Sequence, residues 1–208
     1  MTAAIARRVI ADYAVRIAVG TLFAGLCVNI LNDFVHTGHI TGLLLLMSES
    51  LVVVLTLIRR QATLVDRSVA AGVVTVLSAA GPTLLQPSGD IPPLGPDMAT
   101  GVISAIGLLL VLSGKLTLGR SFGLVPANRG VVVSGPYTAM RHPIYTGYLV
   151  SHLAFLAAHP SMWNIAILSV ADGSLIVRAL MEERVLSRDA SYRAYCRRVG
   201  WHLLPGVF

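Results

Sequence analysis

The sequence predicts an all-α, polytopic membrane protein, and three observations lead to this fold class. Of its 208 residues, 55% are hydrophobic and only 12% are charged, which is about half the charged fraction of a typical soluble domain. The apolar residues form long, nearly uncharged runs, and a helix crosses a bilayer with about 17–25 such residues. These runs also lack the short alternating segments of a membrane β-barrel, so we expect helices, which satisfy their backbone polar groups internally.

The first half of the chain is predicted to contain about four transmembrane helices. The four apolar runs are 15–31, 40–58, 68–85 and 98–114. The segment QPSGDIPPLGPD, residues 86–97, is rich in Pro and Gly and is expected to be a loop between the third and fourth helices. Arg7 and Arg8 precede the first run as in a signal peptide, but the run is long and lacks a clear cleavage site, which favours a retained helix.

Two further apolar runs, 144–158 and 161–180, are predicted to form a helical hairpin that turns at AHPSMWN, residues 158–164. The first arm would reach only roughly 22 Å, at about 1.5 Å per residue. The sequence leaves open whether this arm crosses the bilayer fully. We expect one membrane domain over 1–208, with the first four helices in 1–114 and a more polar core in 115–208.

The placement of charge predicts the orientation in the membrane. The net charge is +6, yet the loops 32–39 and 86–97 contain Asp and no Lys or Arg. With the hairpin counted as out and back, every Lys and Arg falls on the other side, which is the positive-inside pattern. This pattern predicts a protein of the inner cell membrane with both termini in the cytoplasm. It also argues against nucleic acid as the partner and favours the lipid bilayer.

The densest polar segment is GPYTAMRHPIYTGY, residues 135–148. Pro143 suits the first turn of a helix, and Tyr145 and Tyr148 would then share one face of that helix. The free N–H groups of a helix N-terminus next to Arg141 suit an anionic group. An interfacial aromatic belt with an Arg that anchors lipid headgroups is an equally supported alternative.

A second group of charges follows the last apolar run. Arg178 and Glu182 are four residues apart and share a helix face, whereas Glu183 points about 100° away and aligns with Asp172. A surface salt-bridge network and a site for a cationic ligand group both fit this pattern. Glu49 and Asp172 lie inside predicted spans, where a charge costs about 2.5–3.5 kcal/mol, so function or internal pairing is expected. The sequence identifies no partner for Glu49, and a protonated Glu49 bonded between helices is favoured slightly over a catalytic role.

The order of these motifs resembles the isoprenylcysteine carboxyl methyltransferases, their bacterial relatives and the phospholipid methyltransferases, which are integral membrane enzymes. The motifs are SGPY at 134–137, RHPIYTG at 141–147, EERVL at 182–186, YRAY at 192–195, RV at 198–199 and LP at 204–205. Their joint order and spacing are much more specific than any one of them. The resemblance covers about residues 115–208, and the first four runs are similar only in hydropathy.

The resemblance implies S-adenosylmethionine as the cofactor, with S-adenosylhomocysteine as the product and no metal ion. It carries cofactor contacts over to Arg129, Val131, Val132, Tyr137, His142, Pro143, Ile144, Tyr145 and Glu182, and to His202 and Leu203 in a tail that would close over the adenosyl part. It also matches Arg178 to an Arg associated with the methyl acceptor and Arg141 to an Arg important for activity. Two positions differ from the family, because Arg129 stands where the prenylcysteine enzymes usually have His and Gly200 where they often have Pro.

The residue chemistry fits these implied roles. Glu182 can pair with the ammonium group of the cofactor, which would enter from the cytoplasm while a lipid-like or prenylated acceptor enters from the membrane. If the acceptor is a carboxylate, which we favour over an amine, Arg178 or Arg141 would orient it and no base is needed. An amine or hydroxyl acceptor would need a general base, and the candidates are Glu183, Asp172 and His152.

Two other functions fit parts of the sequence. Sterol reductases, which use NADPH, have a similar RHPxYxG segment and a similar end, here YCRRV at 195–199 and PGVF at 205–208. The adjacent Glu182 and Glu183 and the short chain favour methyl transfer over reduction. The third possibility is a membrane scaffold without enzymatic activity, whose charges only anchor it.

Overall fold

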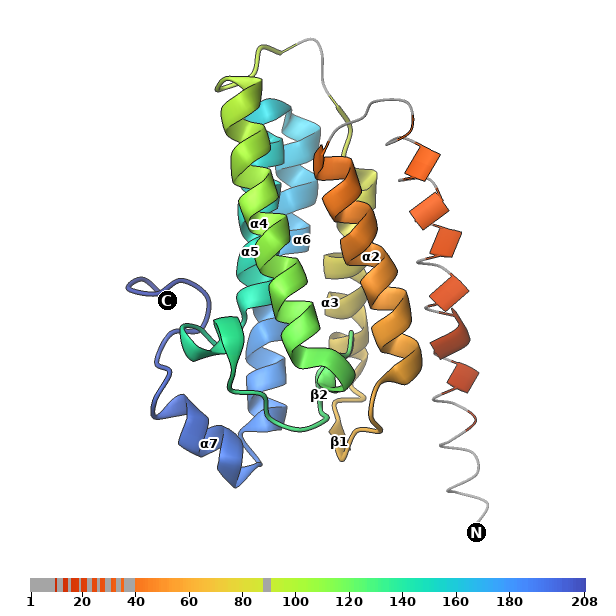
Figure 1. Ribbon diagram of the computed structural model, residues 1–208, viewed down its shortest axis with the longest axis vertical. Coiled ribbons are helices and arrows are strands. Elements are labelled where there is room, and N and C mark those ends of the chain that lie inside the picture. Colours follow the sequence, from red (N-terminus) through yellow and green to blue (C-terminus); the bar gives the residue numbers. More distant parts are fainter. Residues whose placement is uncertain are drawn as a thin grey trace.

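The computed structural model describes residues 40–87 and 91–208, together with scattered positions between 10 and 35. The described part of the chain is mainly helical, as predicted, and its long helices form an up-and-down bundle (Figure 1). The α-helices are α2 (Ile40–Ile58), α3 (Val69–Ala80), α4 (Asp97–Leu118), α5 (Pro143–Ala158), α6 (Met162–Leu186) and α7 (Ala190–Cys196). The 3₁₀ turns are η1 (Gly81–Leu84), η2 (Gly119–Ser121) and η3 (Gly135–Thr138). The strand content of the described residues is β1 (Leu64–Val65), which pairs antiparallel with β2 (Ala127–Asn128).

In the described part of the chain, two helices are long and apolar enough to cross a membrane: Asp97–Ser121, which is α4 with η2, and Met162–Leu186, which is α6. Only 33% of the residues in the apolar window of each are buried in the bundle. Large apolar side chains of both helices are exposed, such as Ile106 on α4 and Val170 on α6. Among the other predicted spans, 40–58 and 68–85 contain shorter apolar helices, whereas 15–31, the loop 32–39, Arg7 and Arg8 lie wholly or partly outside the described residues.

The predicted continuous helix over 68–85 is interrupted. Ser68 caps the start of α3, where its hydroxyl accepts a hydrogen bond from the Ala71 N–H. The α-helix ends at Ala80, and Pro82 lies in the following 3₁₀ turn η1. Proline has no N–H to donate and its ring clashes with the carbonyl four residues earlier, which explains why the α-helix ends at this point.

Helices α4 and α5 pack with almost no side chain between them. A Cβ atom on Gly147 would lie 2.5 Å from the Gly107 carbonyl oxygen and 2.7 Å from Val111 Cγ2. Small residues at such a contact let two helix backbones approach closely. The close contact fixes α5, whose first turn carries the RHPIYTG motif, against the middle of α4.

The polar segments of the chain meet at one end of the bundle, which we call the polar end. It consists of the connections 59–68 and 119–142 and the tail 187–208, which includes α7 (Figure 1). Backbone hydrogen bonds join these segments, from the Arg60 N–H to the Arg120 carbonyl at 2.7 Å and from the Arg141 N–H to the Trp201 carbonyl at 2.9 Å. The two polar stretches of the sequence, which precede and follow the hairpin of α5 and α6, therefore lie close together.

Candidate functional site

A cavity of about 540 Å³ lies between the helices and reaches residues of the polar end, and its volume is within the usual size range of small-molecule sites. Ten of the predicted site residues line it: Arg129, Val131, Val132, Tyr137, Arg141, His142, Ile144, Tyr145, Arg178 and Glu182. The other four are not among the described residues that line it: Pro143, Glu183, His202 and Leu203. The two polar stretches therefore contribute to the lining of one cavity, and the four remaining residues lie next to that lining.

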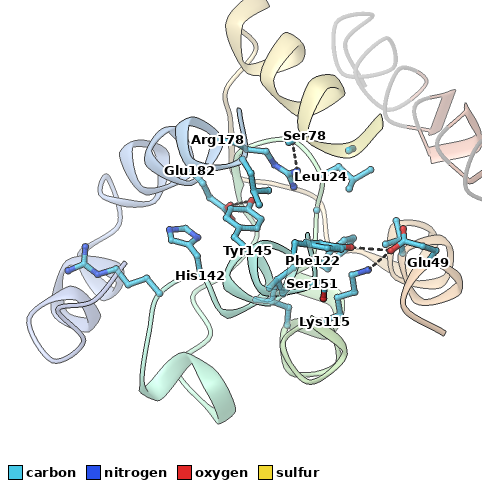
Figure 2. A pocket seen from close by; sticks show the side chains of 18 of the residues that line it. Glu49, Ser78, Lys115, Phe122, Leu124, His142, Tyr145, Ser151, Arg178 and Glu182 are labelled. Carbon is cyan, nitrogen blue, oxygen red and sulfur yellow. Dashed lines mark hydrogen bonds and ion pairs between the residues drawn. The ribbon is translucent and has the colours of Figure 1, made fainter. Parts of the chain in front are cut away.

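Glu182 is the carboxylate of the cavity wall near the polar end. The Tyr145 hydroxyl donates a hydrogen bond to Glu182 Oε2 over 2.7 Å, and the Tyr145 ring stacks on the His142 ring with 5.2 Å between centroids. All three side chains lie together in Figure 2. Because α6 extends six residues beyond the predicted end at 180, Glu182 sits on a regular helix and is held by α5. The hydrogen bond from Tyr145 uses Oε2, which leaves Oε1 for a cationic ligand group.

Arg178 lies one turn before Glu182 and is the cation of the same wall. It is buried, its Nη1 donates to Ser78 Oγ of α3 over 3.2 Å, and its guanidinium lies 5.1 Å from the centroid of the Tyr145 ring (Figure 2). Its Nε has no hydrogen-bond partner among the described residues. A buried, unsatisfied N–H on a charged group is costly, so Arg178 is suited to bind an anionic ligand group.

Glu183 has a different role from its neighbour, because it faces away from the cavity. Its carboxylate accepts hydrogen bonds from Arg141 Nη1 at 2.9 Å, from His142 Nε2 at 2.9 Å and from His202 Nδ1 at 2.7 Å. An ionised carboxylate can only accept, which fixes these ring nitrogens as donors. Glu183 therefore joins α6, the start of α5 and the tail, and with these partners it is poorly suited to take a proton from a substrate.

Arg141 also holds the tail in place. Its Nε donates to the Val199 carbonyl at 2.9 Å and its Nη2 to the Cys196 carbonyl at 3.3 Å, in addition to the contact with Glu183. All three of its nitrogens thus bind protein groups, although the side chain borders the cavity. Arg141 is placed to position the tail, and Arg178 is the better placed of the two to bind an acceptor.

The end of the tail packs against the start of α5. The His202 carbonyl accepts a hydrogen bond from the His142 N–H at 2.9 Å, and the Leu203 carbonyl accepts one from Thr146 Oγ1 at 2.8 Å. Leu203 is buried in the core. The tail thus covers the outer side of the residues that line the cavity, instead of contributing the predicted His202 and Leu203 contacts directly.

Tyr137 closes the cavity next to α7. The Tyr195 hydroxyl donates to the Tyr137 carbonyl over 2.7 Å, which joins η3 to α7. Burial, with a smaller contribution from the Glu182 carboxylate, raises the pKa of Tyr137 well above its usual value. The phenol therefore stays protonated at neutral pH and can donate a hydrogen bond.

The 129–132 segment forms another side of the cavity near the polar end. Arg129 is buried, and its carbonyl accepts a hydrogen bond from Ser121 Oγ at 3.2 Å. Val131 packs beside Tyr192 and Tyr195 of α7. This segment lines the cavity, which is consistent with its predicted part in the cofactor site.

A buried ion pair that the sequence did not reveal lies further along the cavity. Lys115 Nζ is 3.4 Å from Glu49 Oε1 and donates to the carbonyl of Ser48 at 2.9 Å and to its Oγ at 2.7 Å. The Tyr148 hydroxyl donates to Glu49 Oε1 at 3.1 Å. Glu49 therefore has its partner in Lys115 of α4, which the sequence could not identify, and it is hydrogen-bonded between helices as expected. The sequence feature that could have revealed this pair is the chain's single Lys, which lies just past the end of the predicted span 98–114.

The second charge predicted inside a span, Asp172, also has a partner. Its Oδ1 lies 2.6 Å from His152 Nδ1, and His152 stacks against Tyr148. His152 lines the cavity, whereas Asp172 is not among the described residues that do. Of the three predicted base candidates, His152 is the one whose ring borders the cavity.

No protein-family model matches this chain, and no curated protein matches it with a significant score. Among the described residues, no group of three or more His, Cys, Asp or Glu side chains could hold a metal ion.

Proposed function

We propose that this protein is an integral membrane methyltransferase that uses S-adenosylmethionine and a lipid-like or prenylated acceptor. The single observation that supports this best is the cavity near the polar end. There Glu182 and Arg178, from α6, and Tyr145 and His142, from the RHPIYTG motif, line one space. These are the residues that the resemblance to the isoprenylcysteine carboxyl methyltransferases assigns to the cofactor and the acceptor.

The proposed setting is the inner cell membrane, with the polar end in the cytoplasm. Two helices of sufficient length and apolar character support this, as do the apolar side chains that they expose on the outside of the bundle. Exposed apolar surface of that extent is expected where lipid covers it. The basic residues Arg60, Arg120 and Arg141 belong to the connections at the polar end, in agreement with a positive-inside orientation. The four-helix N-terminal arrangement predicted from hydropathy is part of this proposal.

The chain's residues fit the proposed cofactor. When bound, S-adenosylmethionine would supply a methyl group on a sulfonium sulfur, ready for displacement by an acceptor atom. Glu182 Oε1 would bind its ammonium group, and the protonated Tyr137 and the stacked Tyr145 and His142 rings would contact its polar and aromatic parts. The cavity volume of about 540 Å³ is sufficient for a ligand of that size.

Arg178 is proposed to orient the methyl acceptor. The free Nε and the buried position suit a carboxylate, and a carboxylate has no proton to lose, so no general base is required. This is why we favour carboxylate O-methylation over amine N-methylation. The tail, held by Arg141 and Glu183, would cover the reaction site and keep water out.

The experiment that tests the proposal is a transfer assay. The full-length protein in lipid nanodiscs is incubated with methyl-labelled S-adenosylmethionine and a total membrane lipid extract, and the labelled product is identified. The proposal predicts a labelled lipid-like product, absent with Arg178→Gln protein that still binds S-adenosylhomocysteine. Saturable binding of NADPH without any binding of S-adenosylhomocysteine would instead support the reductase.

A further inference from the structure

The cavity extends far beyond the residues assigned to the cofactor. Along α4 its lining runs from Leu118 back to Ser104, a helical rise of about 21 Å. Along α5 it runs from Ile144 to Phe155. A plain hydrocarbon chain would need only apolar walls. This stretch of the cavity instead contains a second group of polar residues, deeper than those assigned to the cofactor.

This second polar group surrounds Tyr148, which lies one helical turn after Tyr145. On one side of Tyr148, Glu49 receives hydrogen bonds from Ser48 Oγ at 3.1 Å and from Tyr148, together with the Lys115 ion pair, all at Oε1. Glu49 is only 6% exposed and lines the cavity. Figure 2 shows Glu49 and Lys115 approaching from the side opposite to Arg178 and Glu182. Its second carboxylate oxygen, Oε2, has no partner among the described residues.

On the other side of Tyr148, His152 presents a similar unpaired atom. Its ring stacks on Tyr148 with 6.0 Å between centroids, and Nδ1 is bound to Asp172 at 2.6 Å. With an ionised Asp172 as the acceptor, Nδ1 is the donor, and in the neutral form of the ring the lone pair lies on Nε2. Nε2 has no partner in the described part of the chain, and the ring lines the cavity.

A purely structural role does not account for both of these atoms. Polar residues often hold helices together in membranes, and that role explains Glu49 Oε1 and His152 Nδ1. It leaves Glu49 Oε2 and His152 Nε2 as two hydrogen-bond acceptors beside the same cavity. Both residues line the cavity, so a ligand group that donates a hydrogen bond to these acceptors would be stabilised here.

We propose that the deep part of the cavity is a second binding subsite, at which Glu49 and His152 bind a hydroxyl or N–H group carried on the chain of the acceptor. This deepens the proposed function and rests on it, since the same molecule would place its reacting group at Arg178. Tyr148 and His152 follow Tyr145 by three and seven residues, which is about 5 and 10 Å along α5. The acceptor is therefore an elongated amphipathic molecule with a hydrogen-bond donor on its chain, and not one with a plain hydrocarbon tail.

The test compares matched probes. Dissociation constants are measured for hexadecanoic acid and for its monohydroxy derivatives, with the hydroxyl at successive carbon atoms, using full-length protein in nanodiscs saturated with S-adenosylhomocysteine. We expect one hydroxyl position to bind about tenfold more tightly than the plain acid, as a hydrogen bond to a charged acceptor allows. The combined variant Glu49→Gln, His152→Phe should lose this preference. The first change replaces the unpaired acceptor with a donor, and the second keeps the stacked ring and removes Nε2.

The control variant is His159→Phe, since His159 is on the same segment but is not among the described residues that line the cavity; it should keep the preference. His152→Phe alone leaves the Glu49–Lys115 pair intact and should reduce the preference, which keeps the test valid if Glu49→Gln does not fold. Equal binding across the series, or a preference that the combined variant retains, would overturn the proposal. Titration of the wild-type protein with S-adenosylhomocysteine reports separately on the proposed function.

Discussion

The Tyr145 hydroxyl donates a hydrogen bond to Glu182 Oε2 over 2.7 Å, and this contact joins the RHPIYTG motif to the EERVL motif across 37 residues. It is formed inside the cavity wall, beside Arg178 and His142. The contact holds the Glu182 carboxylate in one orientation, with Oε1 left for a ligand. The proposed cofactor site depends on this arrangement.

Removal of the Tyr145 hydroxyl should weaken cofactor binding. In Tyr145→Phe, Glu182 loses a charge-assisted donor, and we expect the affinity for S-adenosylhomocysteine to fall about three- to tenfold, or about 0.5–1.5 kcal/mol. Tyr148→Phe is the matched control, because its hydroxyl bonds to Glu49 and not to Glu182. Titration of both variants should show a change only in the first, and equal affinities would argue against this role for Tyr145.

Loss of the Glu183 charge should loosen the tail. Glu183→Gln weakens contacts to Arg141, His142 and His202 at once, and we expect a loss of stability of about 1.5–3 kcal/mol. The thermal unfolding midpoint in detergent should fall, and trypsin should cleave the 190–208 tail faster. Arg184→Gln, at an exposed neighbouring position, should change neither measurement. An intact tail in Glu183→Gln would contradict the positioning role.

The close contact of α4 and α5 should not tolerate a larger residue. Gly147→Ala would place its Cβ 2.5 Å from the Gly107 carbonyl oxygen, and overpacking of this kind costs about 1–3 kcal/mol. Gly101→Ala, on α4, meets nothing within 4 Å and should be neutral or stabilising by up to about 1 kcal/mol, through helix propensity. Thermal unfolding in detergent compares the two, and equal midpoints would show that the helices are not packed as described.

The capping of α7 should depend on pH. The Asp189 side chain caps the helix through the Ser191 N–H and also receives a hydrogen bond from Asn128. Its hydrogen bonds with Ser191 and Asn128 lower the pKa of Asp189 to about 2. Since the folded-state pKa lies below the unfolded value of about 3.9, the stabilisation is complete above about pH 4 and is lost as the pH falls towards 2. Hydrogen exchange of α7 amides should therefore accelerate over that range in the wild type, and an identical acceleration in Asp189→Asn would rule out this group.

The mainly helical fold and the meeting of the polar segments could be predicted from hydropathy and charge placement. The apolar runs at 40–58 and 144–158 closely match α2 and α5, because apolar runs of this length favour helices over strands. The break in the run at 68–85 depends on Pro82, whose effect hydropathy does not register. Likewise, the predicted end of the fourth run at Gly114 stopped before Lys115, whereas α4 continues to Leu118 and Lys115 is paired with Glu49.

The candidate site was predicted through motifs more than through chemistry. Helical spacing separated the faces of Glu182 and Glu183, and the structure places the first in the cavity wall and the second behind it. Spacing could not show that Glu183 binds three cationic or polar partners from distant segments. The pairs Glu49–Lys115 and His152–Asp172 also depend on which helices are neighbours, and that information is not contained in the local sequence.

The most direct test of the central claim is a titration of the purified wild-type protein and Glu182→Gln with S-adenosylhomocysteine. We expect saturable binding by the wild type and an affinity lower by about 1.5–3 kcal/mol in the variant, because a charge-assisted contact is lost. Unchanged affinity in Glu182→Gln, or no binding by the wild type, would contradict the assignment of this cavity to the methyl donor.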